Sequence, residues 1–229
     1  MKMTKVTALG DSVTKGVVLA KDNKYTIAEN CYLDIVSREL DLQITNYGRF
    51  GSTIDMGETM FNRHSDEIAR SGYTFIQYGG NDCDFDWIKI SDSPAQDFAP
   101  NTKVEDFKAK YVRLINKVRS LGSNPVIISL PPILSSSYFS FFTRTMSDEQ
   151  KENVIKWLGG STDIIARWHE SYNRALFMVA KETLTPILDI TTPFDTFRGD
   201  IRTLFCADGI HPNEKGHKLI ATTIINNYL

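Results

Sequence analysis

The sequence has few cysteines, no long apolar run and almost no net charge. Its three cysteines, Cys31, Cys83 and Cys206, are scattered, and no two of them have the spacing of a metal site. An odd number of scattered cysteines predicts free thiols in a reducing compartment. No apolar run approaches the ~18 residues that a membrane span needs, and the run after residues 1–5 is too short for a signal peptide. We therefore expect a cytoplasmic chain that starts at Met1 and has no membrane partner.

The balance of charge excludes another class of protein. The sequence has 26 Lys and Arg against 28 Asp and Glu, a formal net charge of −2. Because a dedicated nucleic-acid-binding protein needs a basic surface, we expect no nucleic-acid partner. Hydrophobic residues make up 41% of the 229 residues, as in ordinary globular proteins. A chain of this length can bury roughly 70% of its unfolded surface, which is enough for one large domain or two small ones.

Short β-branched and aromatic runs alternate with helical patterns along the whole chain. The expected strands are 6–9, 44–47, 73–78, 126–130 and 187–190. Apolar residues recur every three or four positions between them, and the expected helices are 28–40, 55–70, 104–121, 147–158, 163–182 and 213–228. Asn213 is the expected N-cap of the last helix. This alternation predicts an α/β fold, a three-layer α/β/α sandwich around a five-stranded parallel sheet, in a single domain over residues 1–229.

Polar clusters follow four of the five expected strands. They are Gly10-Asp11-Ser12 after the first strand, 46–53 after the second, Gly79-Gly80-Asn81-Asp82 after the third, and Asp208-Gly209-Ile210-His211-Pro212 after the last. Parallel strands present their carboxyl ends at one edge of the sheet, where such folds place their chemistry. Together the clusters contain a hydroxyl, an imidazole, carboxylates and amide donors, which are the parts that an acyl-transfer site requires.

These four blocks, in this order, resemble those of the SGNH hydrolases in the GDSL esterase/lipase superfamily. The resemblance extends over nearly the whole chain and implies a flavodoxin-like SGNH hydrolase fold and a carboxylic-ester hydrolase without metal or cofactor. It also implies a catalytic triad. Ser12 is the expected nucleophile, His211 the base that takes the Ser12 proton and returns it to the leaving group, and Asp208 the carboxylate that orients His211. Asp11 is expected to support the site without reacting.

The resemblance also implies an oxyanion hole. Its expected donors are the backbone N–H groups of Ser12 and Gly51 and the side-chain amide of Asn81. Gly48 competes with Gly51 for this role, but a tight turn is its expected function. Asn46 is expected to brace that turn by a local side-chain hydrogen bond.

Two other interpretations of these residues fail on the sequence. An α/β-hydrolase places its serine in a Gly-x-Ser-x-Gly turn well into the chain, whereas here Thr14 replaces the last glycine and only eleven residues precede Ser12. The alternate carboxylates within 82–86 resemble the start of a calcium loop, but Trp87 stands where that loop requires glycine. We expect these carboxylates to rim a pocket or to cap a short helix.

The segment between the fourth and fifth strands is far longer than a crossover helix requires. A helical, aromatic-rich insertion is therefore expected at about 131–172. Its rings can form a lid or a pocket wall, pack against the added helices, or form an oligomer contact, and the sequence does not decide among these. His64, His169 and His217 lie in helical patterns without a partner motif, so we expect them to pack or to face solvent.

The sequence thus predicts a serine esterase that acts on a small-molecule acyl ester through an acyl-enzyme on Ser12. The expected cytoplasmic location favours a short acyl group, and acetyl is the expected one. A binding protein for an acylated ligand is the alternative from another class, and an acyltransferase or thioesterase on the same site is the alternative within this one. Nothing in the sequence indicates the oligomeric state.

Overall fold

A computed structural model of the chain describes residues 3–227 and contains within them a five-stranded parallel sheet. Its strands, in spatial order, are β4 (Leu42–Asn46), β1 (Thr4–Gly10), β5 (Tyr73–Gln77), β6 (Asn124–Ile128) and β7 (Ile187–Leu188). Each strand overlaps one of the expected strands, so the predicted α/β class with a five-stranded parallel sheet is confirmed. The expected chain start at Met1 and the expected helix end at residue 228 lie outside the described residues.

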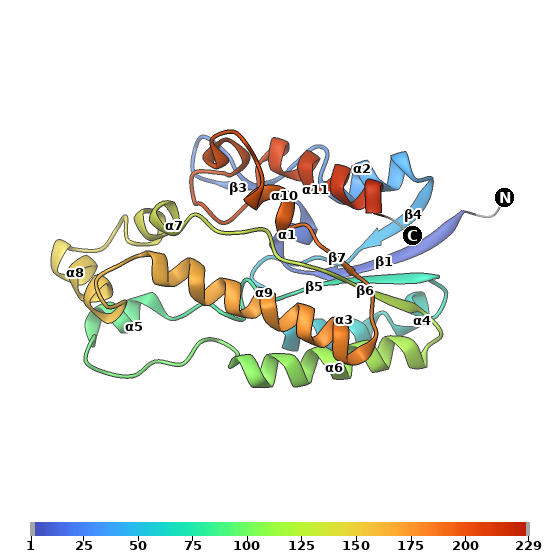
Figure 1. Ribbon diagram of the computed structural model, residues 1–229, viewed down its shortest axis with the longest axis horizontal. Coiled ribbons are helices and arrows are strands. Elements are labelled where there is room, and N and C mark those ends of the chain that lie inside the picture. Colours follow the sequence, from blue (N-terminus) through green and yellow to red (C-terminus); the bar gives the residue numbers. More distant parts are fainter. Residues whose placement is uncertain (1–2, 228–229) are drawn as a thin grey trace.

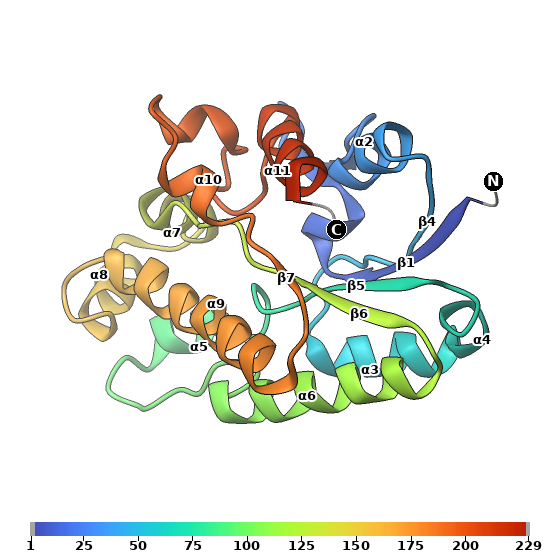
Figure 2. The same cartoon turned by 45° about the vertical axis from the view of Figure 1, so that its right-hand side comes forward.

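Helices cover both faces of this sheet (Figures 1 and 2). The layer at the top of Figure 1 contains α2 (Tyr32–Glu39), α10 (Thr192–Asp195), the 3₁₀ turn η1 (Ile201–Leu204) and α11 (Glu214–Asn227). The opposite layer contains α3 (Ile54–Arg63), α4 (Ser65–Ile68), α6 (Val104–Ser120) and α9 (Asp163–Thr183). None of the helices within residues 3–227 is both long and apolar enough to cross a bilayer.

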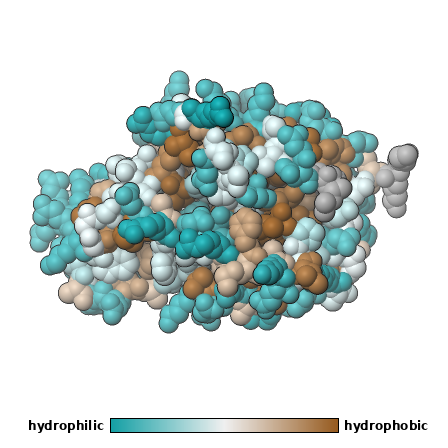
Figure 3. Space-filling view, in the orientation of Figure 1, coloured by the Kyte–Doolittle hydropathy of each residue, from teal (hydrophilic) through white to brown (hydrophobic). Residues whose placement is uncertain are grey.

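The core consists of one apolar layer on each side of the sheet. Because successive strand residues point to opposite faces, Phe75 of β5 packs under α2 and α11, while its neighbour Ile76 packs against α3 and α6. Ile127 and Ile128 divide in the same way on β6. Figure 3 shows hydrophobic side chains gathered beside β6 and β7, where the short edge strand β7 leaves the sheet less covered.

The helix boundaries differ from the expected ones at two places. The helix expected over 55–70 is divided, because His64 leaves the helical conformation with ψ of 21° and stacks on Tyr47 at a centroid distance of 3.7 Å. The helix expected from residue 28 begins at Tyr32, after a capping box in which Cys31 N–H donates to the Asp34 carboxylate. The expected cap at Asn213 is confirmed, since its Oδ1 accepts the N–H groups of residues 215 and 216.

A hairpin that the sequence did not indicate follows β1. It pairs β2 (Val17–Leu19) with β3 (Tyr25–Ile27) in antiparallel fashion, and each strand has only three residues. Three-residue strands separated by a polar loop give too short an alternation to be recognised. The hairpin matters because it brings Tyr25 to the site described below.

The expected insertion is helical and lies beyond the carboxyl ends of the strands (Figure 1). It comprises α7 (Ser135–Phe142), α8 (Asp148–Trp157) and the first turns of α9, and it packs on α5 (Trp87–Asp92). Trp87 stacks on Phe142 with a centroid distance of 4.7 Å. The aromatic rings thus pack against the added helices, one of the arrangements that the sequence left open. That residues 1–229 form a single domain stays a prediction.

The buried His217 gives a prediction for stability at acid pH. It stacks on Tyr32, neither of its ring nitrogens has a hydrogen-bond partner among the described residues, and burial lowers its pKa to about 4. An unfolded chain binds this proton near pH 6.5, so the unfolded state gains protons first as the pH falls and stability decreases between about pH 6.5 and 4. Between pH 7 and pH 4, we expect the unfolding free energy of the wild type to fall by roughly 2–3 kcal/mol more than that of His217→Phe.

Urea unfolding at the two pH values measures this difference. His64→Phe is the matched control, because His64 also stacks on a tyrosine but is only partly buried. If the unfolding free energy of His217→Phe fell as much between pH 7 and pH 4 as that of the wild type, the imidazole of His217 would not be neutral and desolvated as proposed.

Candidate active site

The polar residues that follow β1, β4 and β5 meet at one edge of the sheet. β1 lies between β4 and β5, and all three strands are parallel. The strand order reverses between β1 and β5, and α/β sheets form their binding crevice outside the carboxyl ends of the strands at such a point. Gly10 and Gln77 are register partners at this end. Ser12 and Asn81, which follow them, therefore lie at the mouth of the same crevice.

Ser12 begins the short helix α1 (Ser12–Lys15) directly after β1. Asp11 caps this helix, since its Oδ1 accepts the Val13 N–H at 2.9 Å. Gly16 ends the helix in the left-handed conformation, with φ of 83°. Burial raises the pKa of Asp11 to about 6, and hydrogen bonds from the backbone oppose this shift. Asp11 thus fixes the turn that presents Ser12 and lies beside it in the crevice.

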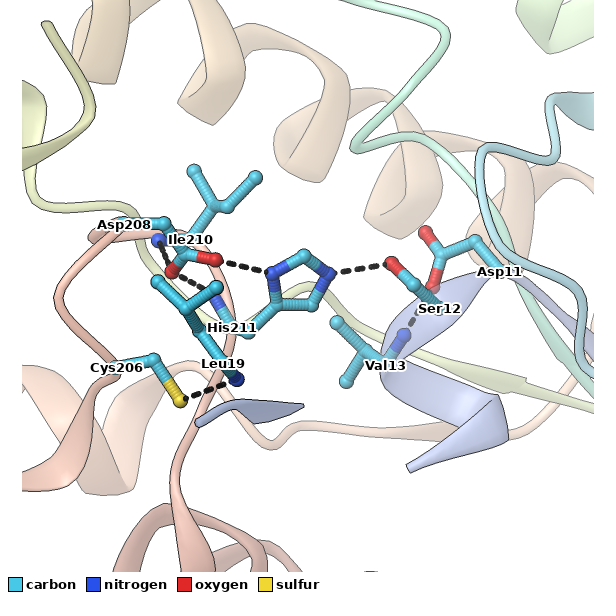
Figure 4. A network of polar contacts seen from close by, with 8 residues as sticks. All are labelled: Asp11, Ser12, Val13, Leu19, Cys206, Asp208, Ile210 and His211. Carbon is cyan, nitrogen blue, oxygen red and sulfur yellow. Dashed lines mark hydrogen bonds and ion pairs between the residues drawn. The ribbon is translucent and has the colours of Figure 1, made fainter. Parts of the chain in front are cut away.

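Three of the predicted residues form one chain of hydrogen-bonded side chains (Figure 4). His211 Nε2 lies 2.8 Å from Ser12 Oγ, and His211 Nδ1 lies 2.7 Å from Asp208 Oδ2. The other oxygen of Asp208 accepts the backbone N–H groups of Ile210 and His211 at 3.2 and 3.1 Å. All three side chains are more than nine-tenths buried. Asp208 and His211 are three positions apart in the sequence, so a single turn of the backbone brings the carboxylate to the imidazole.

The electrostatics of these three hydrogen-bonded side chains favour a proton on His211 Nδ1. Burial by itself would raise the pKa of Asp208, but the hydrogen bonds from the His211 ring and the backbone outweigh it and leave the pKa lowered. An ionised carboxylate can only accept, so Nδ1 carries the proton and Nε2 presents a lone pair to the Ser12 hydroxyl. The arrangement can therefore remove a proton from Ser12.

The loop that carries Asp208 and His211 is held from two sides. Cys206 N–H donates to the His211 carbonyl at 2.8 Å, which closes the loop on itself. Leu134 N–H donates to the Gly209 carbonyl at 2.8 Å, so the start of the insertion supports the loop. Gly209 has φ of 73°, and a Cβ there would lie 2.8 Å from the Leu134 carbonyl oxygen. This close approach requires glycine.

The turn after β4 is braced as expected and packs on α1. Asn46 Oδ1 accepts the Gly48 N–H at 2.8 Å, while Asn46 Nδ2 donates to the Thr14 carbonyl at 2.8 Å. A Cβ on Gly48 would lie 2.5 Å from the Lys15 nitrogen, so this glycine permits close backbone packing. Gly51 differs, because it is exposed, has φ of 68° and would meet no atom within 4 Å.

The turns after β4 and β5 are tied to each other. Asn81 Nδ2 donates to the Ser52 carbonyl at 3.1 Å, and both oxygens of Asp82 accept the Ile54 N–H at 3.1 and 3.2 Å. Asp82 is fully buried, and burial raises its pKa to about 6. These contacts hold Gly51 and Asn81, the two expected donors outside α1, in one rigid unit.

The carboxylates within 82–86 point to separate partners. Asp84 accepts hydrogen bonds from Tyr138 Oη and Trp87 Nε1, both at 2.8 Å, and Asp86 caps α5. Both suggested roles are thus found, since Asp84 lines a cavity and Asp86 caps a short helix. Within residues 3–227 no group of His, Cys, Asp or Glu side chains is arranged to hold a metal ion.

A cavity of about 300 Å³ extends from the triad into the insertion. Ser12, Asn81 and His211 are among the residues that line it. Its walls come from the segment after β5 and from the insertion, and they include Phe85, Trp87, Trp157, Leu158, Ile165 and Trp168. The insertion therefore forms part of a pocket wall and also packs its rings against the added helices. Two of the arrangements that the sequence left open are thus present at once.

Sequence reasoning missed several aromatic residues around the imidazole. Tyr25 and Phe50 lie with ring centroids 5.2 and 6.0 Å from that of His211, and Phe141 lies 6.4 Å from Tyr25. Burial and then the charge of Asp208 raise the pKa of Tyr25. Phe50 lies in the polar block that carries Gly51, so its position in the sequence could have indicated that it lies near the site. The sequence gave no such indication for Tyr25, because its hairpin was not expected.

The three remaining histidines are not part of the triad. His64 packs on Tyr47 and His217 packs on Tyr32. His169 also is buried, as a packing residue would be, but it lines the cavity. Burial lowers the pKa of His169 to about 4, so its imidazole is neutral at physiological pH.

Known proteins share this sequence pattern and this fold. The model of the GDSL-like Lipase/Acylhydrolase family matches residues 8–219. The lipase/acylhydrolase from Enterococcus faecalis is similar in structure, with a TM-score of 0.69 and 18% identity over 98% of this chain and 94% of that one. A catalytic mutant of Axe2, an acetylxylan esterase from Geobacillus stearothermophilus, gives a TM-score of 0.62 and 17% identity over 99% and 95%. No curated protein matches the sequence.

The family model spans all four polar blocks, from the turn that carries Ser12 to the loop that carries His211. The two solved structures, each less than 20% identical, share the fold. The chain therefore belongs to the GDSL-like lipase/acylhydrolase family, the SGNH hydrolases, and is a carboxylic-ester hydrolase.

Proposed function

We propose that the chain is a serine esterase that forms an acyl-enzyme on Ser12. The observation that carries the proposal is the buried hydrogen-bonded chain from Ser12 through His211 to Asp208, with distances of 2.8 and 2.7 Å. A serine hydroxyl is a weak nucleophile until a base takes its proton, and His211 is within reach to do so.

The proposed reaction has two halves. Ser12 Oγ attacks the ester carbonyl carbon while its proton passes to His211 Nε2, which gives a tetrahedral intermediate. The intermediate collapses, the bond to the alcohol oxygen breaks, and His211 donates its proton to that oxygen. Water then enters, loses a proton to His211 Nε2 and attacks the acyl carbon. The bond between this carbon and Ser12 Oγ breaks, His211 returns the proton to Ser12 Oγ, and the acid is released. Asp208 remains ionised throughout and stabilises the imidazolium.

The oxyanion is assigned to three donors, the N–H groups of Ser12 and Gly51 and the amide of Asn81. An amide nitrogen carries two N–H donors. Asn81 uses one on the Ser52 carbonyl, and this contact fixes the amide so that the second is available to the oxyanion. Fixed donors need no reorganisation when charge develops, which is why they lower the barrier.

Hydrolysis is the proposed reaction because the family that the sequence matches is one of acylhydrolases. The imidazole of His211 is only 3% exposed, and the rings of Tyr25 and Phe50 that flank it are 38% and 55% exposed, so these rings separate the site from the surface on this side. A small-molecule ester is the proposed partner. The acetyl group and the cytoplasmic location expected from the sequence stay predictions.

The nucleophile can be tested with a fluorophosphonate probe. The wild type is expected to be labelled at Ser12 and to hydrolyse p-nitrophenyl acetate, and Ser12→Ala to lose both properties. His211→Ala is expected to lower kcat on the order of 10³-fold or more, because Ser12 then lacks its base. Ser120→Ala, on the exposed side of α6, is the control. An unlabelled, inactive wild type would overturn the esterase proposal.

Asn81 tests the oxyanion assignment. Asn81→Ala is expected to reduce kcat by about 10²–10³-fold with a smaller change in KM, because the donor acts on charge that appears in the transition state. Asn124→Ala removes an exposed asparagine at the opposite end of the sheet and should change neither constant. Full activity in Asn81→Ala would show that this amide is not an oxyanion donor.

The two glycines of the turn after β4 are expected to respond differently to alanine. Gly48→Ala forces a Cβ against the Lys15 backbone, so the turn must move away from α1. Gly51→Ala keeps its N–H and meets no neighbour, and its positive φ costs about 1–2 kcal/mol. We expect kcat to fall by roughly tenfold or more in Gly48→Ala and by less in Gly51→Ala. Steady-state kinetics and thermal melts measure the losses of activity and of stability. A larger fall in kcat in Gly51→Ala than in Gly48→Ala would contradict the role of Gly48 in backbone packing.

A further inference from the structure

The cavity beside Ser12 has a definite direction. It leads from the catalytic hydroxyl at the strand ends toward α8, which lies at the end of the molecule farthest from the sheet (Figures 1 and 2). Leu158, which follows the last residue of α8, and Phe98 are among the residues that line it. A group attached to Ser12 would therefore enter the insertion.

The walls of this cavity suit an uncharged apolar group. Phe85, Trp87 and Trp157 present aromatic surface to it, and no lysine or arginine within residues 3–227 lines it. The Asp84 carboxylate is already bonded by Tyr138 and Trp87, and the His169 imidazole is neutral. An acyl group with its own carboxylate would meet no cation there, and it would face Asp11 and Asp84.

The size of the cavity exceeds what an acetyl group fills. An engineered apolar cavity of about 150 Å³ accepts a benzene molecule, and this cavity of about 300 Å³ has twice that volume. A straight acyl chain or an arylalkanoyl group of about six to ten carbons matches it. An acetyl group would leave most of the aromatic wall without contacts.

The acyl group, and not the alcohol, is the part of the ester that belongs in this aromatic cavity. The alcohol must leave and water must enter beside His211, and the rings of Tyr25 and Phe50 that flank it are partly exposed and lie at the surface. The acyl group stays on Ser12 while the alcohol leaves and water enters, so its place in the cavity does not hinder these steps.

We propose that the substrate is an ester of a medium-length, uncharged apolar acid of about six to ten carbons, whose acyl group occupies the cavity between the segment after β5 and helices α7–α9. This inference rests on the proposed function of Ser12. The proposed acyl group is longer than the acetyl group that the sequence predicts, and a chain-length series decides between the two.

A chain-length series of p-nitrophenyl esters tests the proposal with the leaving group constant. Each methylene that enters the cavity is expected to raise kcat/KM by up to roughly fourfold, so octanoate should exceed acetate by about 100-fold or more, and kcat/KM should fall beyond about decanoate. A second series, octanoate esters of methanol to octanol, should vary by less than about tenfold. A maximum at acetate, or a steeper dependence on the alcohol than on the acid, would overturn the proposal.

Leu158→Trp adds volume to the wall of the cavity at the end of α8 and so narrows the space for an acyl chain. We expect it to reduce the ratio of octanoate to acetate kcat/KM by about tenfold or more, because the longest chains lose their contacts first. Lys156→Trp, with an exposed side chain on the same helix, is the matched control and should keep the wild-type ratio. Leu158→Ala enlarges the same region and should move the optimum to longer chains, which keeps the test valid if the tryptophan variant does not fold. An unchanged ratio in a folded Leu158→Trp would overturn the assignment of the cavity.

Failure of this proposal is distinguishable from failure of the proposed function. If Ser12 is labelled by the fluorophosphonate probe and acetate is the best substrate, the esterase proposal stands and the acyl-cavity proposal is wrong. If no ester is hydrolysed and Ser12 is not labelled, the esterase proposal itself is wrong.

Discussion

The parallel pairing of β1 with β4 and β5 is the constraint on which the rest of the structure depends. It sets the turn after β1 between the turns that follow its two neighbours, so α1 is held on one side by Asn46 and lies beside Asn81 on the other. The hydrogen bond between Ser12 and His211 then joins residues 199 positions apart. Closing so long a loop costs entropy, and the pairing of the strands offsets this cost by bringing both ends of the chain together.

Buried carboxylates stabilise this edge of the sheet by capping rather than by ion pairing. Asp11 caps α1, Asp82 caps α3 and Asp208 holds its own turn, each by accepting backbone N–H groups. The pKa values of Asp11 and Asp82 are raised because burial outweighs these bonds, whereas that of Asp208 is lowered because the His211 ring adds its own. Aspartate side chains at this site therefore differ in the direction of their pKa shift, and the hydrogen bond from the imidazole to Asp208 makes the difference.

The insertion gives its aromatic residues two uses. Trp157 of the insertion packs edge-on against Trp87 of α5 and also lines the cavity. Leu134, at the start of the insertion, holds the loop that carries His211. The apolar cluster that stabilises the added helices is thus the wall against which we propose the acyl group to lie. A change in this segment would alter packing and substrate choice together, because side chains in close-packed interiors transmit volume changes to their neighbours.

Local patterns determined much of this protein. The order of strands and helices, the cap at Asn213 and the four polar blocks follow from periodicity and turn chemistry, which act over a few residues. The break at His64 and the hairpin of Tyr25 were not predictable in this way, because ring stacking between separate elements and three-residue strands leave no periodic signal. The family resemblance of the sequence implied that Ser12 and Asn81 belong to the site. It did not indicate that Phe50 lies beside the imidazole or that His169 lines the cavity. Only the tertiary structure decided that the rings of the insertion line a cavity, because its shape and volume arise from packing between segments distant in the chain.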